Sequence, residues 1–207
     1  MARTVKKADE RREEIIKAAR ELFHSREYEK ATMQDLMKTL NIAKGTIYHY
    51  FSSKEDLLEA VVEDLIDEEL RKKEALIEDC RRRNLDAVES IRMLATADRM
   101  AEENEQILDM LHQPGNIILH ARQLGRYLTQ LAPIYAAVIE EGRDQGVFKT
   151  DHPLECAEFL LAGIQFLTDV GFYPWSNEEI ARRMAAFPSL LEDLLSAPEG
   201  SFDFLVE

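Results

Sequence analysis

The chain has 207 residues, of which 45% are hydrophobic and 32% are charged, and its formal net charge is −14. This composition describes a globular protein that can bury a sizeable core, and it excludes a disordered tail. The longest strongly apolar stretch, residues 154–172, is interrupted by four charged or amide side chains. We therefore expect no membrane span, which needs about 20 mainly apolar residues.

The N-terminal sequence MARTVKKADERREE has no apolar core of the kind that a secretory signal carries. Cys80 and Cys156 lack CxxC spacing, so we interpret them as free thiols in a reducing compartment. These features predict a cytoplasmic protein.

The charge is divided unevenly along the chain. Residues 1–54 contain 12 Lys and Arg against 8 Asp and Glu, whereas residues 55–207 contain 14 against 32. A small basic head on an acidic body indicates that only the head approaches a polyanion. A solvated charged surface is the alternative explanation of the same counts.

Apolar residues follow the helical period almost throughout, and no strand alternation or internal repeat stands out. The fold class is therefore predicted to be all-α. The first stripe lies within residues 15–23, and Thr32 then caps a short helix over residues 33–40, with Asp35 near its positive end. A second short helix is expected over residues 44–50.

Ser53 and Asp56 have the spacing of a capping box, and they open a long helix from Lys54 to about Arg83. Later stripes predict helices near residues 88–95, 107–111 and 124–131. Pro133 is expected to start another helix.

The chain between Pro153 and Gly171 is apolar nearly all round, which indicates a helix buried on more than one side. Ser176 or Asn177 can cap a final helix, which Pro188 should kink or split.

Two short helices joined by three residues have the outline of a helix-turn-helix. With Ile47 and Phe51 toward the core, the helical period places four residues on opposite or flanking faces: Gly45, Thr46, Tyr48 and His49. Hydroxyl and imidazole groups there can reach phosphate oxygens and base edges, and a glycine lets the backbone approach a duplex closely. A helical corner whose tyrosines pad a small core is the alternative.

The stretch ATMQDLMKTLNIAKGTIYHYFSSKEDLLEAV resembles the DNA-binding signature of the TetR-type family of bacterial transcriptional regulators. The pattern is Ala-Thr at the second helix, a turn, Lys-Gly-Thr-hydrophobe-Tyr-x-Tyr/His-Phe, and Ser-Lys before a long helix. The match covers roughly residues 11–60. It implies an N-terminal three-helix helix-turn-helix domain, placed at residues 1–53, and a larger helical domain for ligand binding and dimerisation at residues 54–207.

The resemblance also implies roles for single residues. Those aligned with phosphate contacts are Thr32, Tyr48, His49 and Lys54, and those aligned with base contacts are Lys44, Gly45 and Thr46. Two departures stand out: Ala43 replaces a frequent capping serine, and Arg26-Glu27 replaces a frequent glycine. A basic arm of Arg3, Lys6 and Lys7 could reach a neighbouring groove or remain a solvated tail.

In the resembled family the last two long helices form a four-helix dimer bundle, so we expect a homodimer through residues about 153–196. An ordinary intrachain core is the alternative. The remaining helices should surround a pocket for an unknown small-molecule ligand, lined by polar and aromatic residues on otherwise apolar helices: His112, His120, Tyr127, Gln165, Phe166, Asp169, Tyr173 and Trp175. Each of these could instead be a core or surface residue.

The spacing of His112 and His120 around Pro114 matches no standard metal-ligand pattern, so we expect neither a metal site nor a cofactor. No P-loop, GxSxG, HExxH or Rossmann glycine pattern is present, so we expect no enzyme.

The prediction is a homodimeric repressor that a ligand releases from a palindromic operator in double-stranded DNA, although the motif also fits an activator. The rival is a helical ligand-carrier or protein-interaction module that does not read DNA, and the intact Lys44, Gly45, Tyr48 and Lys54 argue against it.

Overall fold

The computed structural model describes residues 8–25, 28–97, 107 and 109–206, and every regular element within them is helical. The head consists of α1 (Ala8–Ser25), a 3₁₀ turn (Tyr28–Lys30), α2 (Met33–Leu40) and α3 (Lys44–Tyr50). The body contains α4 (Lys54–Arg82), α5 (Ala87–Thr96), the 3₁₀ turn η2 (Pro114–Asn116), α7 (Ile117–Asp144), α8 (Pro153–Thr168), α9 (Asn177–Leu195) and the 3₁₀ turn η3 (Asp203–Leu205). The all-α prediction is confirmed.

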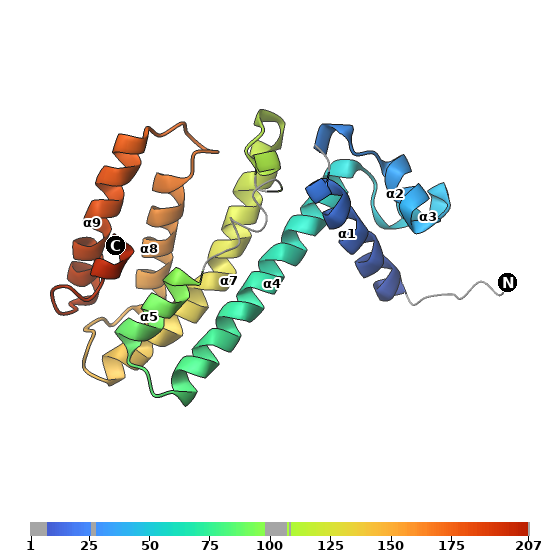
Figure 1. Cartoon of the computed structure of the whole chain (residues 1–207). Coiled ribbons are helices and arrows are strands. Elements are labelled where there is room, and N and C mark those ends of the chain that lie inside the picture. Colours follow the sequence, from blue (N-terminus) through green and yellow to red (C-terminus); the bar gives the residue numbers. More distant parts are fainter. Residues whose placement is uncertain (1–7, 26–27, 98–106, 108, 207) are drawn as a thin grey trace.

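The long helix α4 connects the head to the body, and α7 lies between α4 and α8, with α9 on the outer side of α8 (Figure 1). No helix among the described residues combines the length and the apolar character that crossing a membrane requires.

Side-chain caps define the helices of the head. Thr32 and Asp35 form a reciprocal capping box at the start of α2, and Asn41 ends this helix in the left-handed conformation, with φ of 50°. As expected, Ala43 gives α3 no side-chain cap. At the start of α4 the Ser53 hydroxyl accepts the Asp56 amide at 3.0 Å, but the carboxylate of Asp56 accepts from Ser52 instead of closing the predicted box.

Pro133 and Pro188 lie inside helices, which corrects the predicted helix start at Pro133 and the predicted split at Pro188. α7 continues through Pro133 and does not begin there, and α9 is one helix through Pro188 and is not split. Pro133 has no N–H to donate to the carbonyl oxygen of Thr129, four residues earlier in the helix. Both residues are exposed, so water can donate to that carbonyl oxygen instead. The final helix is capped by Ser176, whose capping-box partner is Glu179.

The interior contains two hydrophobic clusters. The first joins α1, α2, α3 and the first half of α4 to Ile107, Met110, Leu111 and, on α7, Tyr127 and Leu131. The second joins the end of α4 to α5, the second half of α7, α8, α9 and Phe202. Because the first cluster extends from the head into α7, the core is continuous across the boundary expected after residue 53. The basic arm at Arg3, Lys6 and Lys7 and the Arg26-Glu27 loop lie outside the described residues.

Candidate DNA-binding face and sensor region

Helix α3 presents its polar side outward. Ile47 is fully buried and Phe51 is 2% exposed, so this side of α3 is anchored in the first cluster. On the other side Lys44, Gly45, Tyr48 and His49 are exposed and Thr46 is half-buried. The structure therefore brings the expected base-contacting and aromatic residues onto one accessible surface.

Gly45 lies in open space on that surface. A Cβ atom built on it would meet no other atom within 4 Å. Its small size is therefore not required by packing within the protein, which distinguishes it from glycines that are pressed against neighbouring side chains. The ammonium of Lys44 lies 5.5 Å from the ring centre of Tyr48, one turn along the helix.

Lys54 is bound within the protein in this conformation. Its ammonium donates to the carbonyl oxygens of Tyr28 at 2.9 Å and Ala31 at 3.2 Å, and it lies 4.0 Å from the centre of the Tyr28 ring. Lys54 thus ties the start of α4 to the segment between α1 and α2. The hydroxyl of Thr32 similarly donates to Asp35 at 2.6 Å as part of the α2 cap. The phosphate contacts expected of these two residues stay predictions.

An ion pair joins the first helix of the head to α4. The Arg20 guanidinium donates to the Glu68 carboxylate at 2.7 Å. This hydrogen bond is the main cause that holds the pKa of Glu68 below its usual value.

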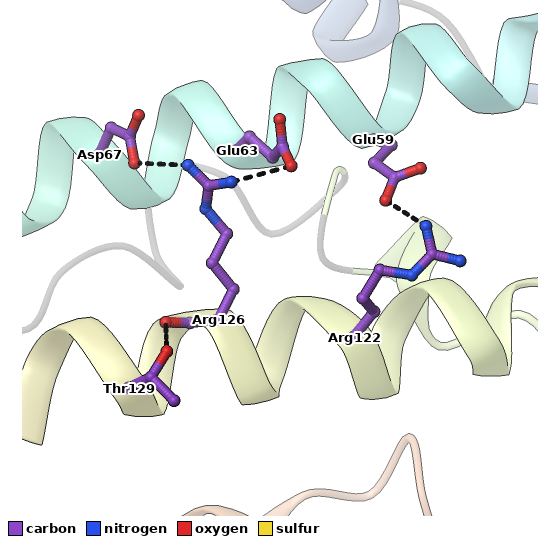
Figure 2. Close-up of polar contacts among 6 residues, drawn as sticks. All are labelled: Glu59, Glu63, Asp67, Arg122, Arg126 and Thr129. Carbon is purple, nitrogen blue, oxygen red and sulfur yellow. Dashed lines mark hydrogen bonds and ion pairs between the residues drawn. The ribbon is translucent and has the colours of Figure 1, made fainter.

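A ladder of ion pairs joins α4 to α7 (Figure 2). Arg122 donates to Glu59 at 2.5 Å, and Arg126 donates to Glu63 at 2.9 Å and to Asp67 at 3.1 Å. The acids recur every four residues on α4 and the arginines are four residues apart on α7, so each set lies on one helix face. The four-residue spacing was visible in the sequence, but the pairing across about 60 residues was not.

Three of the predicted pocket residues converge at the end of the body where α7 begins. The Asp169 carboxylate, just after α8, lies 3.0 Å from Nε2 of His120 on α7 and 3.7 Å from Nε2 of His112. Partial burial raises the pKa of Asp169, but the hydrogen bond and charge of His120, the Gly171 amide and the charge of His112 together lower it below its usual value. His120 is 3% exposed, and its Nδ1 has no hydrogen-bond partner among the described residues.

The predicted aromatic residues gather beside this cluster. Phe172, which the sequence did not single out, stacks on His120 with ring centres 4.7 Å apart, and Phe166 follows at 5.6 Å from Phe172. The Trp175 indole donates to the Phe166 carbonyl at 3.3 Å and lies 4.4 Å from the Tyr173 ring. Phe166 and Tyr173 are more than half exposed, so they line the surface of this region.

Tyr127 and Gln165 complete the predicted set. Tyr127 is 7% exposed and belongs to the first cluster, while Gln165 is half-buried on α8. Sequence analysis missed Gln123, which lies on the inward face of α7 between His120 and Tyr127. Its side chain is 3% exposed, and within the part of the chain that the structure describes its Oε1 has no hydrogen-bond partner. The available signal in the sequence was an amide side chain at a position that the 3.6-residue period places on the inward face of the helix.

The surface formed by α8 and α9 is apolar and open. Phe159 is 73% exposed and Leu190 is 55% exposed, and both border a groove of about 550 Å³. The apolar residues of this groove are Phe159, Leu160, Gly163, Ile164, Leu167, Phe187, Leu190, Leu191 and Leu194. We call it the α8–α9 groove.

Comparisons with known proteins agree with this architecture. Residues 15–61 match the model of the bacterial regulatory proteins of the tetR family, and residues 99–190 match that of the tetracyclin repressor-like C-terminal domain. The HTH-type transcriptional repressor KstR2 of Rhodococcus jostii is 23% identical over 194 residues, which are 92% of this chain and 93% of that protein. The HTH-type transcriptional regulator UidR of Escherichia coli is 41% identical over 51 residues, covering 25% of this chain and 26% of that protein.

Among solved structures, a TetR-family transcriptional regulator from Pectobacterium atrosepticum superposes with a TM-score of 0.68 and 25% identity, covering 94% of this chain and 100% of that one. A putative TetR-family regulator from Mesorhizobium loti gives a TM-score of 0.63 at 20% identity, covering 93% and 98%. With both halves of the chain matched to the family models, the protein belongs to the TetR family of bacterial transcriptional regulators, which bind DNA through the helix-turn-helix that α2 and α3 form here.

Proposed function

We propose that the protein is a homodimeric repressor that binds a palindromic operator through α3 and leaves it when a small molecule binds in the body. The observation that carries the proposal is the outward face of α3. It combines an open glycine with a hydroxyl, an imidazole and a lysine. Such groups suit direct contact with base edges and phosphates in the major groove.

Dimerisation is supported by the α8–α9 groove. Exposed apolar patches of this kind mark interaction surfaces in soluble proteins, and here two long helices supply one continuous surface. A second copy of the same two helices would cover it through a two-fold interface and would place two α3 helices on one side of a duplex. This proposal places the seam within residues about 153–196.

Coupling between the body and the head is supported by the position of α7. Its first turns carry His120 and the arginines that hold Glu59, Glu63 and Asp67 of α4. A ligand that moves the start of α7 would therefore move α4, and α4 follows α3 in the chain after only three residues. Linkage then requires that operator DNA weaken ligand binding by the same factor by which the ligand weakens DNA binding.

Selection of genomic DNA fragments with the purified protein tests this function. We expect enrichment of an inverted repeat whose half-sites are about one helical turn, or 10–10.5 base pairs, apart or a multiple of it. Affinity for the selected site should fall steeply with salt, because counterions are released from the phosphates. Enrichment of fragments without any shared inverted repeat would contradict the dimeric operator model.

A further inference from the structure

We propose that His112, His120 and Asp169 form a binding site for a divalent transition metal ion of the zinc class. Each residue offers one ligand atom, and these three atoms lie within 4.8 Å of one another. Two imidazoles and one carboxylate are the donor set that zinc and its neighbours accept in proteins. The site stands independently of whether the protein binds an operator.

The distances are close to those around a shared ion. Ligand atoms around a tetrahedral zinc ion are about 3.3–3.6 Å apart, since each lies about 2.0–2.2 Å from the metal. Nε2 of His120 lies 3.0 Å from Oδ2 of Asp169 and Nε2 of His112 lies 3.7 Å from Oδ1, so an ion held by both imidazoles and one carboxylate oxygen requires only a small movement of the side chains. Without an ion, 3.7 Å is too long for a hydrogen bond, so only His120 is satisfied by the carboxylate. His112, whose side chain is 33% exposed, is the ligand with room to close the remaining gap.

The backbone is shaped to hold the three side chains together. Gly171 lies against both imidazoles, and a Cβ on it would come within 2.3 Å of His112 and 2.8 Å of His120. Its amide donates to the Asp169 carboxylate at 2.7 Å, which fixes one oxygen of that ligand. On the other side the Phe172 ring stacks on His120 at 4.7 Å and limits its rotation. These contacts orient the ligands in the way that surroundings of metal sites do.

Three protein ligands leave at least one coordination position of a zinc ion open. A water molecule or a donor atom of a small molecule would occupy it. The metal site would thus provide a strong polar anchor beside the aromatic surface of Phe166 and Trp175.

Titration of the chelator-treated full-length protein with Zn²⁺, against a chromophoric competitor, tests the site. We expect one ion per chain, a rise in the melting temperature, and a change in the emission of Trp175, the only tryptophan. Co²⁺ in place of Zn²⁺ should give visible d–d absorption typical of mixed nitrogen and oxygen ligands.

The variants His112→Gln and Asp169→Asn should each weaken binding at least tenfold, and both keep the size of the side chain that they replace. His152→Gln is the matched control, because His152 is exposed and lies outside the cluster. Circular dichroism and gel filtration of the metal-free variants establish that they are folded. Less than one-tenth of an ion per wild-type chain, or equal affinity in all three folded variants, would overturn the proposal.

Discussion

Replacing Gly45 by alanine separates DNA recognition from protein stability. Because a Cβ at this position meets no atom within 4 Å, the substitution creates no clash in the free protein. Alanine is more favourable than glycine in a helix by up to about 1 kcal/mol. We therefore expect the melting temperature of Gly45→Ala to stay constant or to rise by about 2–4 °C, the shift that 1 kcal/mol gives in a protein of this size.

Operator binding should change in the opposite direction. If the α3 backbone lies in van der Waals contact with the duplex, the added methyl group, about 1.5 Å from Cα, forces the helix to retreat by about 1 Å. The contacts of Lys44 and Thr46 with base edges would then lengthen, and each good contact contributes about 1–3 kcal/mol. Loss of one such contact corresponds to an affinity about 5- to 150-fold lower. Gly45→Leu should abolish specific binding altogether.

Fluorescence anisotropy with the selected operator, together with thermal unfolding of the same samples, measures both effects. Gly125→Ala is the matched control, because Gly125 is also helical and exposed with open space around its Cα. The control should gain the same stability and keep full affinity. If Gly45→Ala and Gly45→Leu bind the operator as tightly as the control does, the backbone of α3 does not approach DNA at this residue.

The other predictions concern α4 and the dimer. Lys54→Ala should lower the melting temperature, because the Lys54 ammonium binds two backbone carbonyls of the head. It should also weaken binding to all duplexes alike and reduce the salt slope by about one, as the expected phosphate contact requires. An unchanged slope would restrict Lys54 to its contacts within the protein. Phe159→Glu should yield folded monomers in sedimentation, since a carboxylate would enter an apolar seam. The control Ile118→Glu, at a residue with the same exposed fraction of 73%, should stay dimeric. Dimers of both variants would place the seam elsewhere. Glu68→Gln should be less stable than the wild type in urea unfolding at pH 7, because the pair of Glu68 with Arg20 lowers the folded-state pKa of Glu68. This difference should shrink as the pH falls below about 4.3, the ordinary pKa of a glutamate, and disappear below the lowered folded-state pKa. A difference that stays constant down to pH 3 would show that the charge of Glu68 is not its cause.

Local rules predicted the head well. The bounds of α2 and α3, the Thr32 cap and the outward position of Tyr48 all follow from caps and from a 3.6-residue period, which involve residues close in sequence. The same rules misplaced the start of a helix at Pro133, because they count the lost hydrogen bond and not the packing on either side that keeps α7 continuous.

Contacts between residues far apart in the chain could not be predicted from the sequence. The spacing of His112 and His120 gave no metal pattern because the third member of the cluster, Asp169, follows a different helix. The partners of Lys54 were equally hidden, since they are backbone carbonyls of the segment before α2. All three members of the cluster are among the residues that residue type and helix face singled out in the sequence, because neither criterion requires knowledge of the pairing.

The ladder between α4 and α7 contains three acids and two arginines at a common spacing of four residues, and the two helices run parallel (Figure 2). Sliding α7 by one turn toward the far end of α4 would pair Arg122 with Glu63 and Arg126 with Asp67, but it would leave Glu59 without its arginine and bring Arg126 toward Arg71. Charge therefore favours the present register over this slip. The apolar contacts of Tyr127 and Leu131 favour the same register, so the ion pairs and the hydrophobic core both determine where α7 rests.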